Sequence, residues 1–125
     1  MNYFIVFAGA GIGGALRHGV NVLVARLWSI DFPFGTLSIN IIGSLLMGFI
    51  VGYLAHIGAA PPQVRLFLTT GVVGGFTTFS AFSLETVMLY ERGQWALAVV
   101  YVVSSIVLSV GALVAGLLLI RSLAS

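Results

Sequence analysis

The sequence predicts an all-α membrane protein: four transmembrane helices in one bundle, the third of them broken near its middle. Three observations support this fold class. Hydrophobic residues make up 60% of the 125 positions and charged residues only 6%, and the mean hydropathy is +1.18, so the chain has more apolar surface than a soluble domain of its size can bury. The apolar residues gather in four runs of bilayer length. Glycines and threonines interrupt the third run.

The composition also restricts the classes of function. The chain has no cysteine, which excludes disulfides and thiolate metal sites. A net charge of +2 without any lysine gives no reason to expect a nucleic-acid partner. The sequence offers no nucleophile–base pair or metal-ligand cluster, so we do not expect an enzyme. We expect a single domain, residues 1–125, that crosses a lipid bilayer several times.

The predicted spans follow one another with short separators. They cover about residues 3–25, 34–56, 64–90 and 95–120, each long enough for a hydrocarbon core of ~30 Å. The first run lacks a basic segment before it and three more runs follow it, so we interpret it as a retained helix and not a signal peptide. Aromatic residues near the ends of several runs suit the membrane interface: Tyr3, Trp28, Tyr53, Tyr90 and Trp95.

The arginines between the spans do not select an orientation. With four spans, Arg65 and Arg121 share one side of the membrane and Arg26 and Arg92 share the other. The positive-inside rule therefore gives a tie of two against two. Such a chain can insert both ways, which would permit an antiparallel homodimer. The alternative is a weak bias that still gives one orientation.

The first run holds a glycine-rich motif and a charge. Gly9-Ala10-Gly11-Ile12-Gly13-Gly14 matches a dinucleotide fingerprint, but that fingerprint needs a soluble βαβ unit. We therefore interpret Gly9-xxx-Gly13 as a face for close helix packing. Arg17 lies well inside the apolar run, where a charge must snorkel, pair or face water. It either snorkels to the interface or forms an electropositive vestibule that attracts an anion.

Polar side chains form stripes on the second and fourth runs. Thr36, Asn40 and Ser44 share one helix face. Asn40 either joins helices by hydrogen bonds or offers its amide hydrogens to an anion. The same spacing recurs in three hydroxyl residues of the fourth run: Tyr101, Ser105 and Ser109. Back-bonding to the helix explains any one of these hydroxyls, whereas three in register favour a polar track.

The third run contains the break, within residues 71–82. Its Gly74-Gly75 pair is a place where a helix can open, and unwound backbone in a membrane indicates an ion or substrate site. Alternatively, Gly71-xxx-Gly75 only lets a neighbouring helix approach. Just beyond, Phe79 and Phe82 share a face and either pack or turn positive ring edges to an anion. Glu85, one turn further, ends this track or is a solvated charge.

Three blocks of the chain resemble the Fluc/CrcB family of small fluoride channels. Residues 36–43 match that family's Thr-Leu-x-Val-Asn-x-x-Gly pattern, and residues 71–82 match Gly-x-x-Gly-Gly-x-Thr-Thr-Phe-Ser-x-Phe closely. Residues 9–17 are similar to its Gly-Gly-x-x-Gly-Ala-x-x-Arg segment, with Ala10 and Gly14 as changes between small residues and His18 in place of a tyrosine. The resemblance covers essentially the whole chain.

The resemblance implies passive export of fluoride across the cell inner membrane by an antiparallel, dual-topology homodimer with two pores. It implies that a structural sodium ion lies at the dimer centre, held by the backbone carbonyls of Gly74 and Thr77. Arg17 and Glu85 would belong to the vestibules. The implied pore residues are a donor, an aromatic box and a polar track: Asn40, Phe79, Phe82, Thr36, Tyr101, Ser105 and Ser109.

Two other classes of function stay open from the sequence. A small multidrug exporter also has four helices and dual topology, but it needs a membrane-embedded carboxylate to exchange protons for drugs. The first three runs hold one acid, Glu85, which lies toward a helix end. A non-transporting interaction protein would use the glycines for packing alone.

Overall fold

The computed structural model describes residues 1–27, 32–58 and 60–124. Within these residues every regular element is helical. The first two helices are α1 (Asn2–Leu27) and α2 (Phe34–Ile57), and the last is α6 (Trp95–Ala124). Between α2 and α6 the chain forms four shorter pieces: α3 (Pro62–Leu66), the π-helix η1 (Phe67–Val73), α4 (Gly74–Phe76) and α5 (Ser80–Glu91). Residues 28–31 of the first predicted separator, with Trp28, lie outside the described residues.

Three segments of the described chain are long and apolar enough to cross a membrane: Phe34–Ile57, Pro62–Glu91 and Trp95–Leu123. They agree with three of the predicted spans in position, length and apolar composition. The fourth prediction, residues 3–25, is confirmed only as a helix. With 26 residues and ~1.5 Å per residue, α1 has the required length, but Arg17, His18 and Asn21 interrupt its apolar run.

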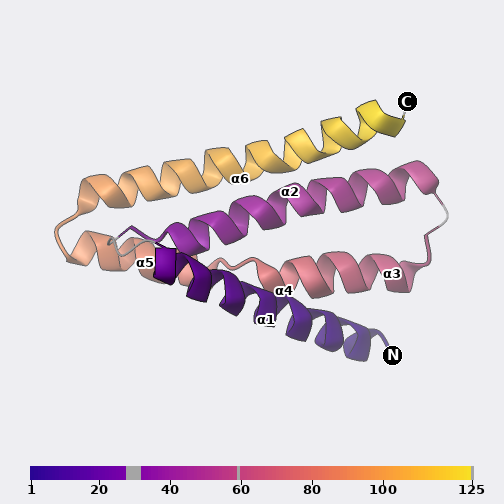
Figure 1. Ribbon diagram of the computed structural model, residues 1–125, viewed down its shortest axis with the longest axis horizontal. Helices are drawn as coiled ribbons and strands as arrows, with labels where there is room; N and C mark the ends of the chain where they lie inside the picture. The colour runs from indigo at the N-terminus through magenta and orange to yellow at the C-terminus, as the bar shows by residue number, and fades with distance from the viewer. Residues whose placement is uncertain (28–31, 59, 125) are drawn as a thin grey trace.

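The long segments run back and forth (Figure 1). Both termini, the end of α2 and the start of α3 lie at one end of the molecule, and α5 meets α6 at the other. Helix α2 packs mainly against α6, while α1 packs on η1 and α4. Arg65 in α3 and Arg121 in the last turn of α6 therefore lie at the opposite end from Arg92. The count of arginines on each side of the membrane assumes that successive helix ends alternate in this way.

Glycines bring α1 into backbone contact with η1 and α4. A Cβ atom on Gly9 would lie 2.8 Å from the Phe67 carbonyl oxygen and 2.9 Å from Gly71 Cα. One on Gly75 would lie 2.7 Å from Ala10 Cα. Only glycine fits at such distances, so the close-packing role of Gly9-xxx-Gly13 and of Gly71-xxx-Gly75 is confirmed.

The third segment breaks, but after the glycine pair. Gly74 has helical angles (φ −61°, ψ −38°), whereas Thr77 is extended (φ −79°, ψ 163°) and the helix resumes only at Ser80. The expectation that the chain opens at Gly74-Gly75 is therefore wrong. Gly75 serves the contact with α1 instead, and the backbone leaves the helix where side chains replace its hydrogen bonds, as described below.

The buried core is small, and large apolar side chains cover the outside. Leu37, Leu89, Ala98 and Tyr101 form the buried cluster. Many other aliphatic and aromatic residues stay exposed over the outer faces of α1 and α6, among them Phe4, Phe7 and Val107. A soluble monomer rarely exposes so much contiguous apolar surface. The surface therefore fits a lipid environment.

Candidate functional site

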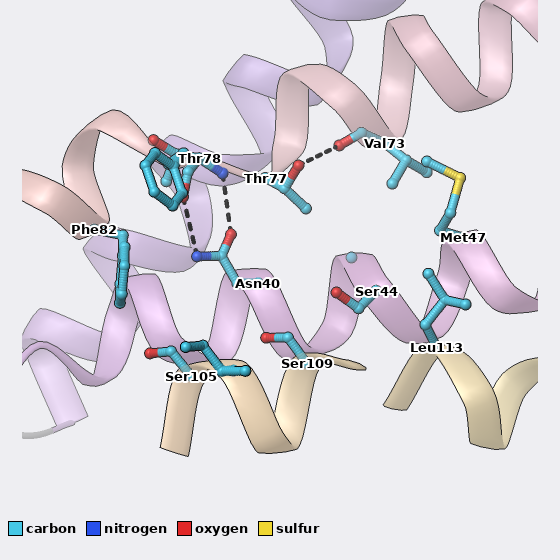
Figure 2. A pocket seen from close by; sticks show the side chains of 13 residues that line it. Asn40, Ser44, Met47, Val73, Thr77, Thr78, Phe82, Ser105, Ser109 and Leu113 are labelled. Carbon is cyan, nitrogen blue, oxygen red and sulfur yellow. Dashed lines mark hydrogen bonds between the residues drawn. The ribbon is translucent and has the colours of Figure 1, made fainter. Parts of the chain in front are cut away.

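An open cavity of about 350 Å³ lies beside the break, between α2, α6 and the start of α5 (Figure 2). Five of the seven predicted pore residues line it: Asn40, Phe79, Phe82, Ser105 and Ser109. Thr77, one of the two predicted cation ligands, also lines it. Ser44 completes this wall one helical turn beyond Asn40. The structure thus brings together most of the residues that the sequence singled out.

Asn40 holds the broken backbone with both ends of its amide. Its Oδ1 accepts a hydrogen bond from the Thr78 N–H at 3.0 Å, and its Nδ2 donates to the Thr78 carbonyl at 3.0 Å; Figure 2 shows both bonds. These bonds satisfy backbone groups that a helix would otherwise pair and that hydrocarbon cannot solvate. The helix-joining role of Asn40 is therefore confirmed. The amide carries a second Nδ2 hydrogen, which no other described residue accepts.

Thr78, one residue before the N-cap Phe79, bonds to the first turn of α5, a contact that sequence reasoning missed. Its Oγ1 accepts a hydrogen bond from the Ala81 N–H at 3.2 Å. Its hydroxyl also lies 3.4 Å from Ser80 Oγ. The signal was available, because a threonine just before a helical run is a usual start signal for a helix.

These side-chain bonds release two backbone carbonyls. In an α-helix the Thr78 N–H would bond to the Gly74 carbonyl, and the Ala81 N–H to the Thr77 carbonyl. Here both amides bond to side chains. Gly74 is also exposed in the single chain. Carbonyl oxygens are ligands that suit a hard cation, and the described residues contain no cluster of three or more acidic, histidine or cysteine side chains. The chemistry of these two positions fits the predicted sodium ion.

Two serines of α6 direct unpaired hydroxyls at the cavity. Ser105 Oγ and Ser109 Oγ are buried and have no hydrogen-bond partner among the described residues, and both residues line the cavity. Buried hydroxyls are normally paired. These two are therefore available as donors to a ligand that enters the cavity.

An aromatic row runs from the cavity to the core. The ring centroids of Phe79 and Phe82 lie 5.5 Å apart, and Phe82 lies 5.1 Å from Tyr101. Phe79 is 77% exposed, whereas Tyr101 is completely buried. Tyr101 lies behind Phe82 and outside the cavity lining, and its hydroxyl also lacks a partner among the described residues. In the single chain the row is thus open at its Phe79 end.

The remaining predicted residues lie away from the cavity. Thr36 is buried, and its Oγ1 donates to Glu85 Oε1 at 2.5 Å. Glu85 lines a separate cavity of about 150 Å³ together with Arg92. Arg17 is half-buried on α1, and it does not line the 350 Å³ cavity. The sequence did not indicate the pairing of Thr36 with Glu85, because the two residues are 49 positions apart.

Comparison with known proteins gives consistent matches over almost the full length. The family described as CrcB-like protein, Camphor Resistance (CrcB), matches residues 4–117. "Fluoride-specific ion channel FluC 2" of Nitrobacter hamburgensis is 55% identical over 123 residues, which cover 98% of this chain and 99% of that protein. "Fluoride-specific ion channel FluC" of Granulibacter bethesdensis is 58% identical over 123 residues, covering 98% and 97%. The protein of the same name from Methylobacterium nodulans is 54% identical over 121 residues, covering 97% of each chain.

Proposed function

The chain belongs to the CrcB-like family, and we propose that it is a fluoride-selective ion channel that lets fluoride leave the cytoplasm passively. Relatives at 55% and 58% identity bear the name fluoride-specific ion channel. The observation in the structure that carries the proposal is the set of free donors around one cavity: the second Nδ2 hydrogen of Asn40 and the unpaired hydroxyls of Ser105 and Ser109.

Fluoride is small and holds its water shell tightly, so a path through the membrane has to replace that shell with donors at close range. Amide and hydroxyl hydrogens do this. The rings of Phe79 and Phe82 add positive edges without a fixed charge. Among the described residues, no charged side chain lines the cavity. An anion can therefore bind there and leave again, which conduction requires.

We propose that the working unit is an antiparallel homodimer in the cell inner membrane, with α1 as a fourth span in each copy and two pores per dimer. Three observations support this. The cavity is open in the single chain, Phe79 at its edge is 77% exposed, and the arginines of the separators give no orientation bias. A second copy would close the cavity and cover the exposed ring. Each pore would then use residues of both copies.

We further propose that a structural sodium ion binds at the centre of this dimer. The carbonyls of Gly74 and Thr77, which lack their usual helical donors, would hold it in each copy. Sodium would supply the positive charge that keeps these carbonyls together. Arg17 would supply positive charge at one vestibule. Glu85, bonded to Thr36, would mark the other end of the path.

The test is fluoride efflux from liposomes that hold the purified protein, followed with a fluoride electrode. We expect rapid efflux that needs no proton gradient and no efflux of chloride under the same conditions. Uptake of a cationic drug driven by protons would instead indicate a multidrug exporter. The absence of any flux would indicate an interaction protein.

A further inference from the structure

We infer that Thr78 is a positioning residue: its backbone and hydroxyl keep the Gly74 and Thr77 carbonyls free for a cation, and Asn40 couples the fluoride path to them. This inference rests on the proposed function. The backbone N–H and the hydroxyl of Thr78 affect different carbonyls. In an α-helix each N–H bonds to the carbonyl four residues before it. Its N–H bonds to Asn40 and not to Gly74, and its hydroxyl holds the Ala81 N–H away from Thr77.

The side-chain bonds of the Thr78 and Ala81 amides replace the backbone bonds that these amides would make in an unbroken helix. Thr77 already directs both its N–H (3.0 Å) and its hydroxyl (3.1 Å) to the Val73 carbonyl. Without the Thr78 hydroxyl, the Ala81 N–H would be unpaired in an apolar environment. It would regain a partner by closing a helical bond to the Thr77 carbonyl. That bond would compete directly with a cation for the same oxygen.

Asn40 links the two sites because its two amide groups have different roles. Its Oδ1 holds the Thr78 N–H, and its Nδ2 holds the Thr78 carbonyl while one hydrogen remains for the ion path. An anion that accepts a hydrogen bond from this second hydrogen therefore contacts the same amide that holds the Thr78 backbone at the break. The fluoride path and the cation ligands share one rigid connection of three hydrogen bonds.

The Thr78→Val variant tests the inference, since it keeps the shape of the side chain and removes the hydroxyl. We would measure the sodium concentration that half-saturates the rise in thermal stability of the purified protein. We expect this concentration to increase about tenfold, as the loss of one hydrogen bond predicts, and Thr78→Ser to stay near the parent. The matched control is Thr86→Val, because Thr86 Oγ1 donates to the Phe82 carbonyl in the same helix. A Thr78→Val protein with the sodium dependence of the parent would overturn the inference, as would an equal shift in Thr86→Val.

Fluoride efflux separates this inference from the proposed function. Thr78 also lines the cavity, so we expect efflux through Thr78→Val to increase with the sodium concentration without reaching the rate of the parent. Asn40→Ala should show the same increase in the half-saturating sodium concentration. It should lack efflux at every sodium concentration, because it also loses the donor to fluoride. If the parent protein shows no fluoride efflux, the proposed function is refuted, whether or not sodium raises its thermal stability. A conducting parent whose Asn40→Ala variant keeps the sodium dependence of the parent refutes only the coupling.

A measurement on the parent needs no folded variant. The amides of Thr78 and Ala81 should be protected from hydrogen exchange, because both bond to side chains. If Thr78→Val is not monodisperse, two other measurements test the inference: this hydrogen exchange and the sodium dependence of thermal stability in Asn40→Ala. Fast exchange of both amides would overturn the inference.

Discussion

Replacing Ser105 by alanine should separate a hydroxyl that serves an ion from one that serves the fold. Ser105 is 7% exposed and its Oγ has no partner among the described residues. An unpaired buried hydroxyl destabilises a protein by ~1–3 kcal/mol, and this is an upper bound because water or an ion in the cavity offsets part of it. Ser105→Ala removes the hydroxyl and little volume. The free energy of unfolding should therefore stay the same or rise by ~1 kcal/mol.

The effect on fluoride flux should have the opposite sign. If the Ser105 hydroxyl donates to the ion, its loss removes one hydrogen bond to a charged species, worth ~1.5 kcal/mol or more. A barrier raised by ~1.4 kcal/mol slows passage about tenfold. We therefore expect a protein that is at least as stable as the parent and conducts about ten times more slowly. Ser109→Ala should behave in the same way.

The neighbouring Ser104 provides the matched control. Its Oγ donates to the Val100 carbonyl at 2.6 Å, so it is paired within α6, and it does not line the cavity. Ser104→Ala should lower the free energy of unfolding by ~0.5–1 kcal/mol and leave the flux unchanged. Unfolding in detergent and fluoride efflux from liposomes give the two readouts. The reasoning is refuted if Ser105→Ala loses more than ~1 kcal/mol and conducts like the parent.

Three further predictions follow from the packing, the charges and the rings. Gly13→Ala should lower the free energy of unfolding by ~1–3 kcal/mol, since a Cβ would lie 2.7 Å from the Phe76 amide nitrogen. A Cβ on Gly14 would meet no atom of the described residues within 4 Å, so Gly14→Ala should be neutral; equal effects of the two changes in chemical unfolding would contradict the docking of α1. Two lysines added within residues 58–62 should fix one orientation and abolish efflux until a copy biased the other way is co-expressed; full activity from the biased protein alone would exclude the antiparallel dimer. Phe79→Leu and Phe82→Leu should cost less than ~1.5 kcal/mol in stability yet lose most fluoride efflux, and normal efflux in both would leave the rings a packing role only.

Composition and hydropathy predicted the class of fold and the boundaries of the long helices. The predicted spans at 34–56 and 95–120 agree within a few residues with Phe34–Ile57 and Trp95–Ala124. This follows from hydropathy and length, which depend on the composition of a segment and not on its neighbours. The matching glycine spacings of α1 and the third segment are local patterns too, and their close packing is confirmed.

The position of the break depends on contacts between helices. Gly74 and Gly75 are weak helix formers, but α1 packs against Gly75 and both stay helical. The chain opens at Thr77, where Asn40 from another helix supplies partners for the backbone of Thr78. In an apolar environment a helix can open only where such partners exist. Residues 38 positions apart supply them here, and no local pattern indicates which pair of residues will meet.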